Sequence, residues 1–132
     1  MTRRLRALRG RRDGSAAVEF ALAVPLMILF LAGISQVGIL FAANAGLQQA
    51  IGEGARFATL YPRPDDGAVT ARVQRAAFAL NSHYLGAPVL THGTSNGVPY
   101  VDISLTYRPP TNFVFFQGPT LSITRTRRAY LN

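Results

Sequence analysis

The chain has 132 residues and a net charge of +8, which leaves room for one small domain but not for two. It contains no cysteine, and this excludes a disulfide framework, a thiolate zinc site and a cysteine nucleophile. All of its basic residues are arginines, so a phosphate-binding loop that needs lysine is excluded as well. The strong positive charge raises the question of nucleic-acid binding, and the placement of the arginines answers it.

Six of the fourteen arginines lie directly before a long apolar segment. They are Arg3, Arg4, Arg6, Arg9, Arg11 and Arg12. A basic block in this position is the usual signal that keeps one end of a membrane protein in the cytoplasm. We therefore interpret it as a topogenic leader rather than a nucleic-acid-binding arm, and we expect no nucleic-acid partner. The interpretation places the N-terminus in the cytoplasm and the C-terminal part on the outer side of the membrane.

The apolar segment predicts one transmembrane helix. No charged side chain occurs between Glu19 and Glu53, and residues 20–43 exceed the roughly 20 residues that a helix needs to cross the hydrocarbon core of a bilayer. The alternative is a cleaved signal peptide, because the Ala-Asn-Ala sequence at 43–45 matches the small-x-small pattern of a cleavage site. The apolar stretch is, however, longer than the roughly 7–15 residues of a signal-peptide core.

The helical pattern continues beyond the predicted span. Leu47, Ile51 and Ala55 recur at helical spacing, and the helix is expected to break at Tyr61, since a residue that precedes proline is pushed out of the helical region. At 1.5 Å per residue such a helix is about 70 Å long, more than twice the hydrocarbon thickness. Its second half should project from the membrane and offer an apolar face to a domain.

Glu19 lies at the entrance of the apolar segment. A carboxylate in this position is costly and usually has a partner or a function, although it could also simply lie at the headgroup level. Residues 11–20 read Arg-Arg-Asp-Gly-Ser-Ala-Ala-Val-Glu-Phe: a basic leader, Gly14, four small or apolar residues, Glu19 and an aromatic residue, Phe20. This stretch resembles the processing motif of class III (type IVb-like) prepilins, and most closely that of the TadE-like minor pilins of the tight-adherence (Tad) pilus. Members of that family often have tyrosine where this chain has Phe20.

The resemblance implies a processing step and a set of partners. A prepilin peptidase would cut between Gly14 and Ser15 on the cytoplasmic side, and Glu19 with Phe20 would contribute to recognition. Glu19 would then pair with the new amino group of a neighbouring subunit and set the register of the filament. The implied partners are the peptidase, the major pilin and other minor pilins, the Tad inner-membrane assembly platform, and membrane lipid.

The same resemblance implies a location, the bacterial inner membrane, with the C-terminal domain in the periplasm and an extracellular pilus as a further location. The alternative is an unprocessed, signal-anchored inner-membrane protein whose periplasmic domain binds another component of the envelope. That protein would need neither cleavage after Gly14 nor a carboxylate at Glu19.

The C-terminal part predicts a second helix. Asp65, Asp66 and Gly67 are typical of a turn that can also cap a helix. Apolar residues follow at helical spacing: Val69, Val73, Ala76, Ala77, Leu80 and Tyr84. We expect this helix to end near residues 86–88, a Gly-Ala-Pro sequence.

A small antiparallel sheet should follow. Residues 101–107 alternate apolar and polar side chains, and a short strand at 88–92 precedes them, joined by a hairpin connection over 93–97. A last strand over 120–129 contains Arg125, Arg127 and Arg128, which interrupt its alternation and indicate an exposed edge. The predicted fold is α+β and pilin-like: a long N-terminal transmembrane helix with a second helix and a small antiparallel sheet packed on its outer half. Its parts are a leader (1–14), the long helix (15–61) and a periplasmic domain (62–132).

An apolar cluster interrupts this domain. Residues 113–116 read Phe-Val-Phe-Phe, between a Pro-Pro pair and a Gly-Pro pair. Either the cluster tucks under the domain and completes its core, or Phe113, Phe115 and Phe116 form a partner-facing patch.

Catalytic chemistry has no support in the sequence. The two histidines, His83 and His92, lack metal-ligand spacing, and neither a nucleophile motif nor a phosphate-binding loop is present. We therefore predict that the protein is not an enzyme and has no catalytic residue, no cofactor and no metal.

Overall fold

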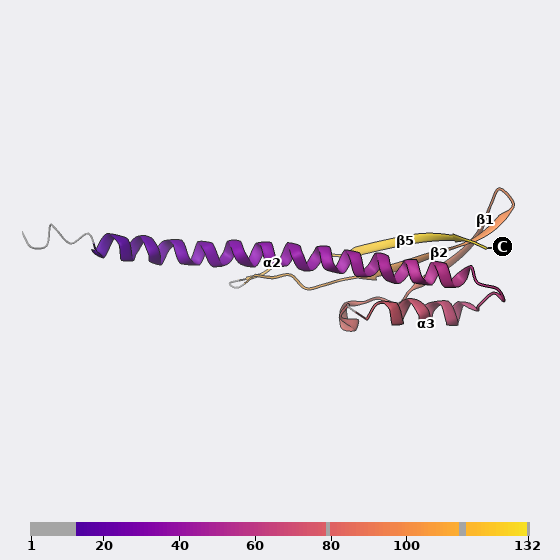
Figure 1. The fold of residues 1–132 in the computed structure, drawn as a ribbon. Coiled ribbons are helices and arrows are strands. Elements are labelled where there is room, and N and C mark those ends of the chain that lie inside the picture. The colour runs from indigo at the N-terminus through magenta and orange to yellow at the C-terminus, as the bar shows by residue number, and fades with distance from the viewer. Residues whose placement is uncertain (1–12, 79, 114–115, 132) are drawn as a thin grey trace, which may run out of the picture.

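One long helix organises the molecule. The structure is a computed structural model and describes residues 13–78, 80–113 and 116–131. Helix α2 (Asp13–Ala58) runs along the whole molecule, and all other elements gather around its C-terminal half (Figure 1). Within the described residues they comprise helix α3 (Asp66–Ala76), a 3₁₀ turn η1 (Ser82–Tyr84) and five strands. The predicted α+β class is confirmed.

The strands form two separate antiparallel groups. Strands β1 (Val89–Ser95), β2 (Val98–Tyr107) and β5 (Ile123–Tyr130) make a sheet in the order β1-β2-β5. Strands β3 (Asn112–Phe113) and β4 (Phe116–Gln117) pair only with each other. We call the paired strands β3 and β4 (residues 112–113 and 116–117) the β3–β4 hairpin. The position of β5 at an edge of the larger sheet confirms the prediction from its arginines.

The turn between β1 and β2 is tighter than predicted. Asn96 and Gly97 both have positive φ angles, 51° and 79°, as a two-residue hairpin turn of type I′ requires. Residues 93–95, predicted as part of the connection, therefore belong to β1. Gly93 is needed within that strand because a Cβ atom there would overlap the ring of Tyr100.

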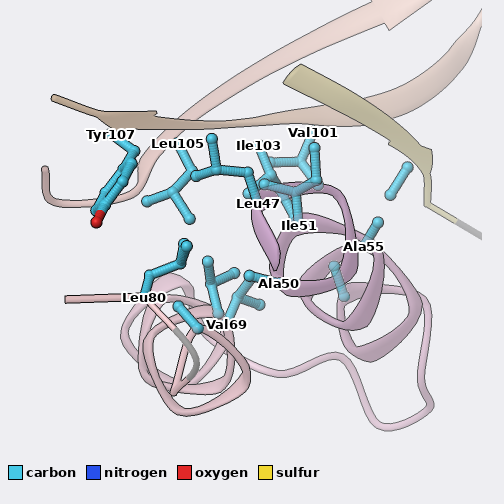
Figure 2. Packing of buried hydrophobic residues seen from close by; sticks show 14 of the residues in the cluster. Leu47, Ala50, Ile51, Ala55, Val69, Leu80, Val101, Ile103, Leu105 and Tyr107 are labelled. Carbon is cyan, nitrogen blue, oxygen red and sulfur yellow. The ribbon is translucent and has the colours of Figure 1, made fainter. Parts of the chain in front are cut away.

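The core lies between the sheet and the two helices. Val101, Ile103 and Leu105 of β2 point to one face and are almost fully buried. They meet Leu47 and Ile51 of α2, and α3 closes the third side (Figure 2). The period of two on β2 and the helical spacing on α2 therefore bring their apolar faces together, as the two patterns predicted.

The second helix is shorter than predicted, because α3 ends at Ala76 instead of continuing to residues 86–88. Asn81 accounts for part of the difference: its side-chain oxygen accepts a hydrogen bond from the His83 N–H (3.0 Å) and caps η1. Asparagine side chains compete in this way with the backbone bonds of a helix. Ala77 and Leu80 are still buried. The apolar spacing therefore predicted correctly that these residues are buried. It did not predict that the chain leaves the α-helical conformation after Ala76.

The arginines of β5 lie on both faces of the sheet. Arg125 is opposite Leu105 in the register, so it leaves the sheet on the side of α2. It reaches past the flank of that helix and donates to Asn44 Oδ1 at 2.7 Å. Arg128 lies on the other face, where it donates two hydrogen bonds of 2.8 Å to the carboxylate of Asp102. Edge exposure is what allows the strand to carry these charges.

The ion pair between Arg128 and Asp102 makes the stability of the fold depend on pH. The hydrogen bonds from Arg128 hold the pKa of Asp102 below its ordinary value of 3.8. A carboxyl group whose pKa is lower in the folded chain stabilises the fold above the unfolded pKa, and this stabilisation is lost as the pH falls through the folded pKa. We expect the thermal midpoint of the full chain in detergent, followed by circular dichroism, to decrease below about pH 4.

Asp102→Asn should lower the midpoint at neutral pH and make its decrease in acid shallower. Part of the decrease should remain, because Arg72 similarly lowers the pKa of Glu53 by a hydrogen bond of 2.8 Å. An acid profile identical in wild type and Asp102→Asn would contradict the assignment.

Candidate functional site

The N-terminal half of α2 extends away from the domain and exposes an apolar surface. Its large exposed side chains are Val18, Phe20, Leu22, Leu26, Met27, Ile28, Phe30, Leu31, Ile34, Val37, Ile39 and Phe41. Among the described residues, this is the one helix that is long and apolar enough to cross a membrane, and none of its most apolar window is buried in the protein. The same helix continues into the half that lies beside the domain (Figure 1).

Glu19 lies on this free half of the helix, close to its N-terminal end. The hydroxyl of Ser15 donates a hydrogen bond of 3.3 Å to Glu19 Oε1, across one helical turn. Phe20, beside it, is 70% exposed. The carboxylate, the first residue of the predicted mature chain and an aromatic ring are therefore grouped at one end of the helix. The six arginines of the predicted leader lie outside the described residues.

The bond between Gly14 and Ser15 lies within α2, at the N-terminal end of the part of this helix that the structure describes.

Phe113 and Phe116, the described residues of the apolar cluster at 113–116, do not complete the core. Phe113 and Phe116 stack with their ring centroids 4.8 Å apart, and Phe116 is 55% exposed. Neither belongs to the core cluster, so the interpretation as a core segment is wrong for these two residues. Val114 and Phe115 lie outside the described residues. The hairpin instead runs back along α2, toward the free half of the helix (Figure 1).

A groove lies between the β3–β4 hairpin and α2. One hydrogen bond fixes its position: Gln36 Nε2 donates to the backbone oxygen of Asn112 at 2.6 Å. The groove has a volume of about 530 Å³ and is almost entirely apolar. It is lined by Phe30, Gly33, Ile34, Gln36, Val37, Leu40, Thr111, Phe113 and Leu121.

Sequence reasoning did not assign a role to Gln36. The signal that could have indicated a role is that Gln36 is a single amide side chain in an apolar helix. Polar side chains in such segments are costly when unpaired, so a partner is expected. Its acceptor is far away in the sequence, and only the tertiary structure identifies it.

The small-x-small pattern of the signal-peptide alternative lies inside a helix. Helix α2 continues without a break through residues 43–45. Ala43 is 5% exposed and Leu47 is fully buried, both within the core of the domain. The segment before the cleavage pattern is therefore continuous with a structural helix that the domain uses for its own packing.

Neither histidine belongs to a cluster with metal-ligand geometry. His92 pairs with Asp66 of α3 at 2.9 Å, and His83 packs edge-on against the ring of Tyr84. No group of three or more His, Cys, Asp or Glu side chains that could hold a metal occurs within the part of the chain that the structure describes.

These features define a class of protein. Within the described residues, one exposed apolar helix with a carboxylate near its N-terminal end continues into the core of a small α+β domain, an arrangement that fits a membrane-anchored protein. Residues 14–56 match the family of TadE-like proteins. The match covers about a third of the chain and coincides with α2 from Gly14 to Arg56, which confirms the resemblance to the TadE-like pilins of the Tad system. No curated protein and no solved structure matches the chain.

The matched family suggests a coarse class of function, because TadE-like pilins are structural components of the pilus. The apolar helix and the family together fit a membrane-anchored protein.

Proposed function

We propose that this protein is a minor pilin or pseudopilin that takes part in assembly of a Tad-type pilus, after a prepilin peptidase has removed residues 1–14. The single observation that carries the proposal is the coincidence of three features on one helix. The family match begins at Gly14, the exposed apolar half of α2 follows it, and Glu19 lies near the N-terminal end of that half.

The proposal includes an orientation and a division of the chain. The leader (1–14) lies in the cytoplasm, the helix (15–61) crosses the inner membrane over roughly residues 20–43, and the domain (62–132) lies in the periplasm. The arginine-rich leader supports this orientation by the positive-inside rule. The peptidase and the Tad assembly platform in the inner membrane are the partners at this stage.

Cleavage would place a positive amino group at Ser15, one turn before Glu19. The hydrogen bond from the Ser15 hydroxyl to Glu19 supports the idea that this carboxylate can reach groups at the new N-terminus. In the filament the carboxylate would pair with the amino group of a neighbouring subunit. Two unit charges 4 Å apart attract each other by about 4 kcal/mol at an effective dielectric constant of 20. A misregistered subunit lacks this pair, so Glu19 acts as a register device.

The test is the intact mass and N-terminal sequence of the protein from its native membrane. We expect a chain that begins at Ser15, because the peptidase would act on the cytoplasmic side. This result would support both the processing step and the orientation. A chain that begins at Met1 would contradict the proposal and favour an unprocessed, signal-anchored protein; a chain that begins near Gly46 would favour a signal peptide. A strain without the peptidase is the control, and it should yield the unprocessed mass.

A further inference from the structure

We propose that the β3–β4 hairpin inserts into the outer leaflet of the membrane beside α2, and that lipid acyl chains fill the groove between them. The inference rests on the proposed membrane span and adds a second point of contact with the bilayer. It identifies the partner of the patch around Phe113 and Phe116 as lipid rather than another protein.

The position of the hairpin along α2 carries the inference. Gln36, which holds Asn112, lies about 26 Å along the helix from Glu19 at 1.5 Å per residue. The hydrocarbon core of a bilayer is about 30 Å thick. With Glu19 at the inner boundary, the contact between Gln36 and the hairpin lies within the outermost few ångströms of the hydrocarbon. The hairpin thus reaches membrane depth without any change of conformation.

The described backbone at the base of the hairpin suits this depth. Polar backbone groups in hydrocarbon need partners within the protein. The Asn112 carbonyl accepts from Gln36, and the Gly118 N–H donates to the Thr111 carbonyl at 2.7 Å. The Thr111 hydroxyl is buried and donates to the Pro119 carbonyl at 2.6 Å. The base of the hairpin is therefore closed by its own hydrogen bonds.

The side chains indicate the chemistry of the occupant. The groove presents Ile34, Val37 and Leu40 from α2 and Phe113 and Leu121 from the other wall. This surface continues directly from the exposed apolar surface of the span, which acyl chains already cover in the proposed orientation. Aromatic side chains such as those of Phe113 and Phe116 add apolar surface where the hydrocarbon meets the headgroups. One lipid environment can consequently cover both surfaces without a second binding partner.

A cation lies above the hairpin at the level expected for lipid headgroups. Arg125 bonds to Asn44, which lies about 38 Å along the helix from Glu19. The bilayer including its headgroups is about 40–45 Å thick, so this position is at the outer edge of the headgroup layer. The Arg125 side chain is exposed and can approach lipid phosphates. An apolar hairpin with a cation above it matches the order of acyl chain and phosphate in the outer leaflet.

The absence of tryptophan from the chain makes a depth measurement straightforward. Phe116→Trp places a single fluorophore on the hairpin with little change of shape. Leu26→Trp reports on the span itself, and Tyr61→Trp reports on a side chain that is 99% exposed just beyond the C-terminal end of α2. Each full-length variant is reconstituted in vesicles of phosphatidylcholine and phosphatidylglycerol whose acyl chains carry bromine as a quencher. Circular dichroism confirms that each variant folds.

We expect Phe116→Trp to lose most of its emission in brominated vesicles, to an extent comparable with Leu26→Trp, while Tyr61→Trp loses almost none. Quenching of Leu26→Trp without quenching of Phe116→Trp would overturn the hairpin inference and leave the span intact. Unquenched Leu26→Trp would overturn the span and the inference together. Shielding of Phe116→Trp that occurs only at high protein-to-lipid ratio would mean that a second copy occupies the groove, and would also overturn the inference.

Discussion

A chain that carries Glu19→Ala is expected to enter the membrane normally and to support few or no pili. Membrane insertion depends on the apolar length of α2, which this substitution leaves unchanged. The filament, in contrast, would lose an ion pair of about 4 kcal/mol between neighbouring subunits. This loss would reduce the preference for the correct register roughly a thousandfold. The measurement is a count of pili by electron microscopy in a strain whose only copy is the variant. An immunoblot of the membrane fraction verifies that the protein is present.

Two further variants separate the charge of Glu19 from its hydrogen bond. Glu19→Gln keeps the size of the side chain and can still accept from the Ser15 hydroxyl, so loss of pili in this variant would identify the charge as the essential property. Ser15→Ala removes the hydroxyl but keeps the new amino group, and it should leave pili intact. Normal piliation in Glu19→Ala would remove the argument for a register device.

Gly54→Ala should destabilise the domain, although alanine favours helices more than glycine does. Gly54 is buried where α2 crosses α3, and a Cβ atom there would overlap the side chain of Val73. Val73 is fully buried and β-branched, so it cannot turn away easily. Extra volume in a well-packed core costs about 1–3 kcal/mol, more than the roughly 0.5–1 kcal/mol that alanine gains over glycine in a helix.

The measurement is the thermal midpoint of the full chain in detergent. For a domain of this size, each kcal/mol lost lowers the midpoint by about 4–8 °C. Gly52→Ala is the matched control, because its Cβ atom would meet only the flexible end of Arg127 at 3.4 Å. The control should be neutral or slightly stabilising. An unchanged or higher midpoint in Gly54→Ala would show that the helices can separate at their crossing at little cost.

The sequence alone determined the elements whose signal is local or periodic. The uncharged interval between Glu19 and Glu53 predicts a spanning helix, because hydrocarbon tolerates no long polar segment. Helix α2 covers this whole interval without a break. The alternation on β2 predicts a strand with one buried face for a similarly local reason. The motif from Gly14 to Phe20 carried the family resemblance, which the match to residues 14–56 confirms.

The tertiary structure decided whatever depends on a partner distant in the sequence. The end of α3 at Ala76 could not be derived from apolar spacing, because buried residues continue through η1 and beyond the helix. The place of Phe113 and Phe116 was likewise undetermined, since an apolar cluster is compatible with a core or with a surface. The hydrogen bond from Gln36 to Asn112 decides between these two places, because it holds the hairpin against the N-terminal half of α2 instead of within the domain. Local patterns fix which faces are apolar, and long-range packing decides which of those faces the protein itself covers and which it leaves for the membrane or the filament.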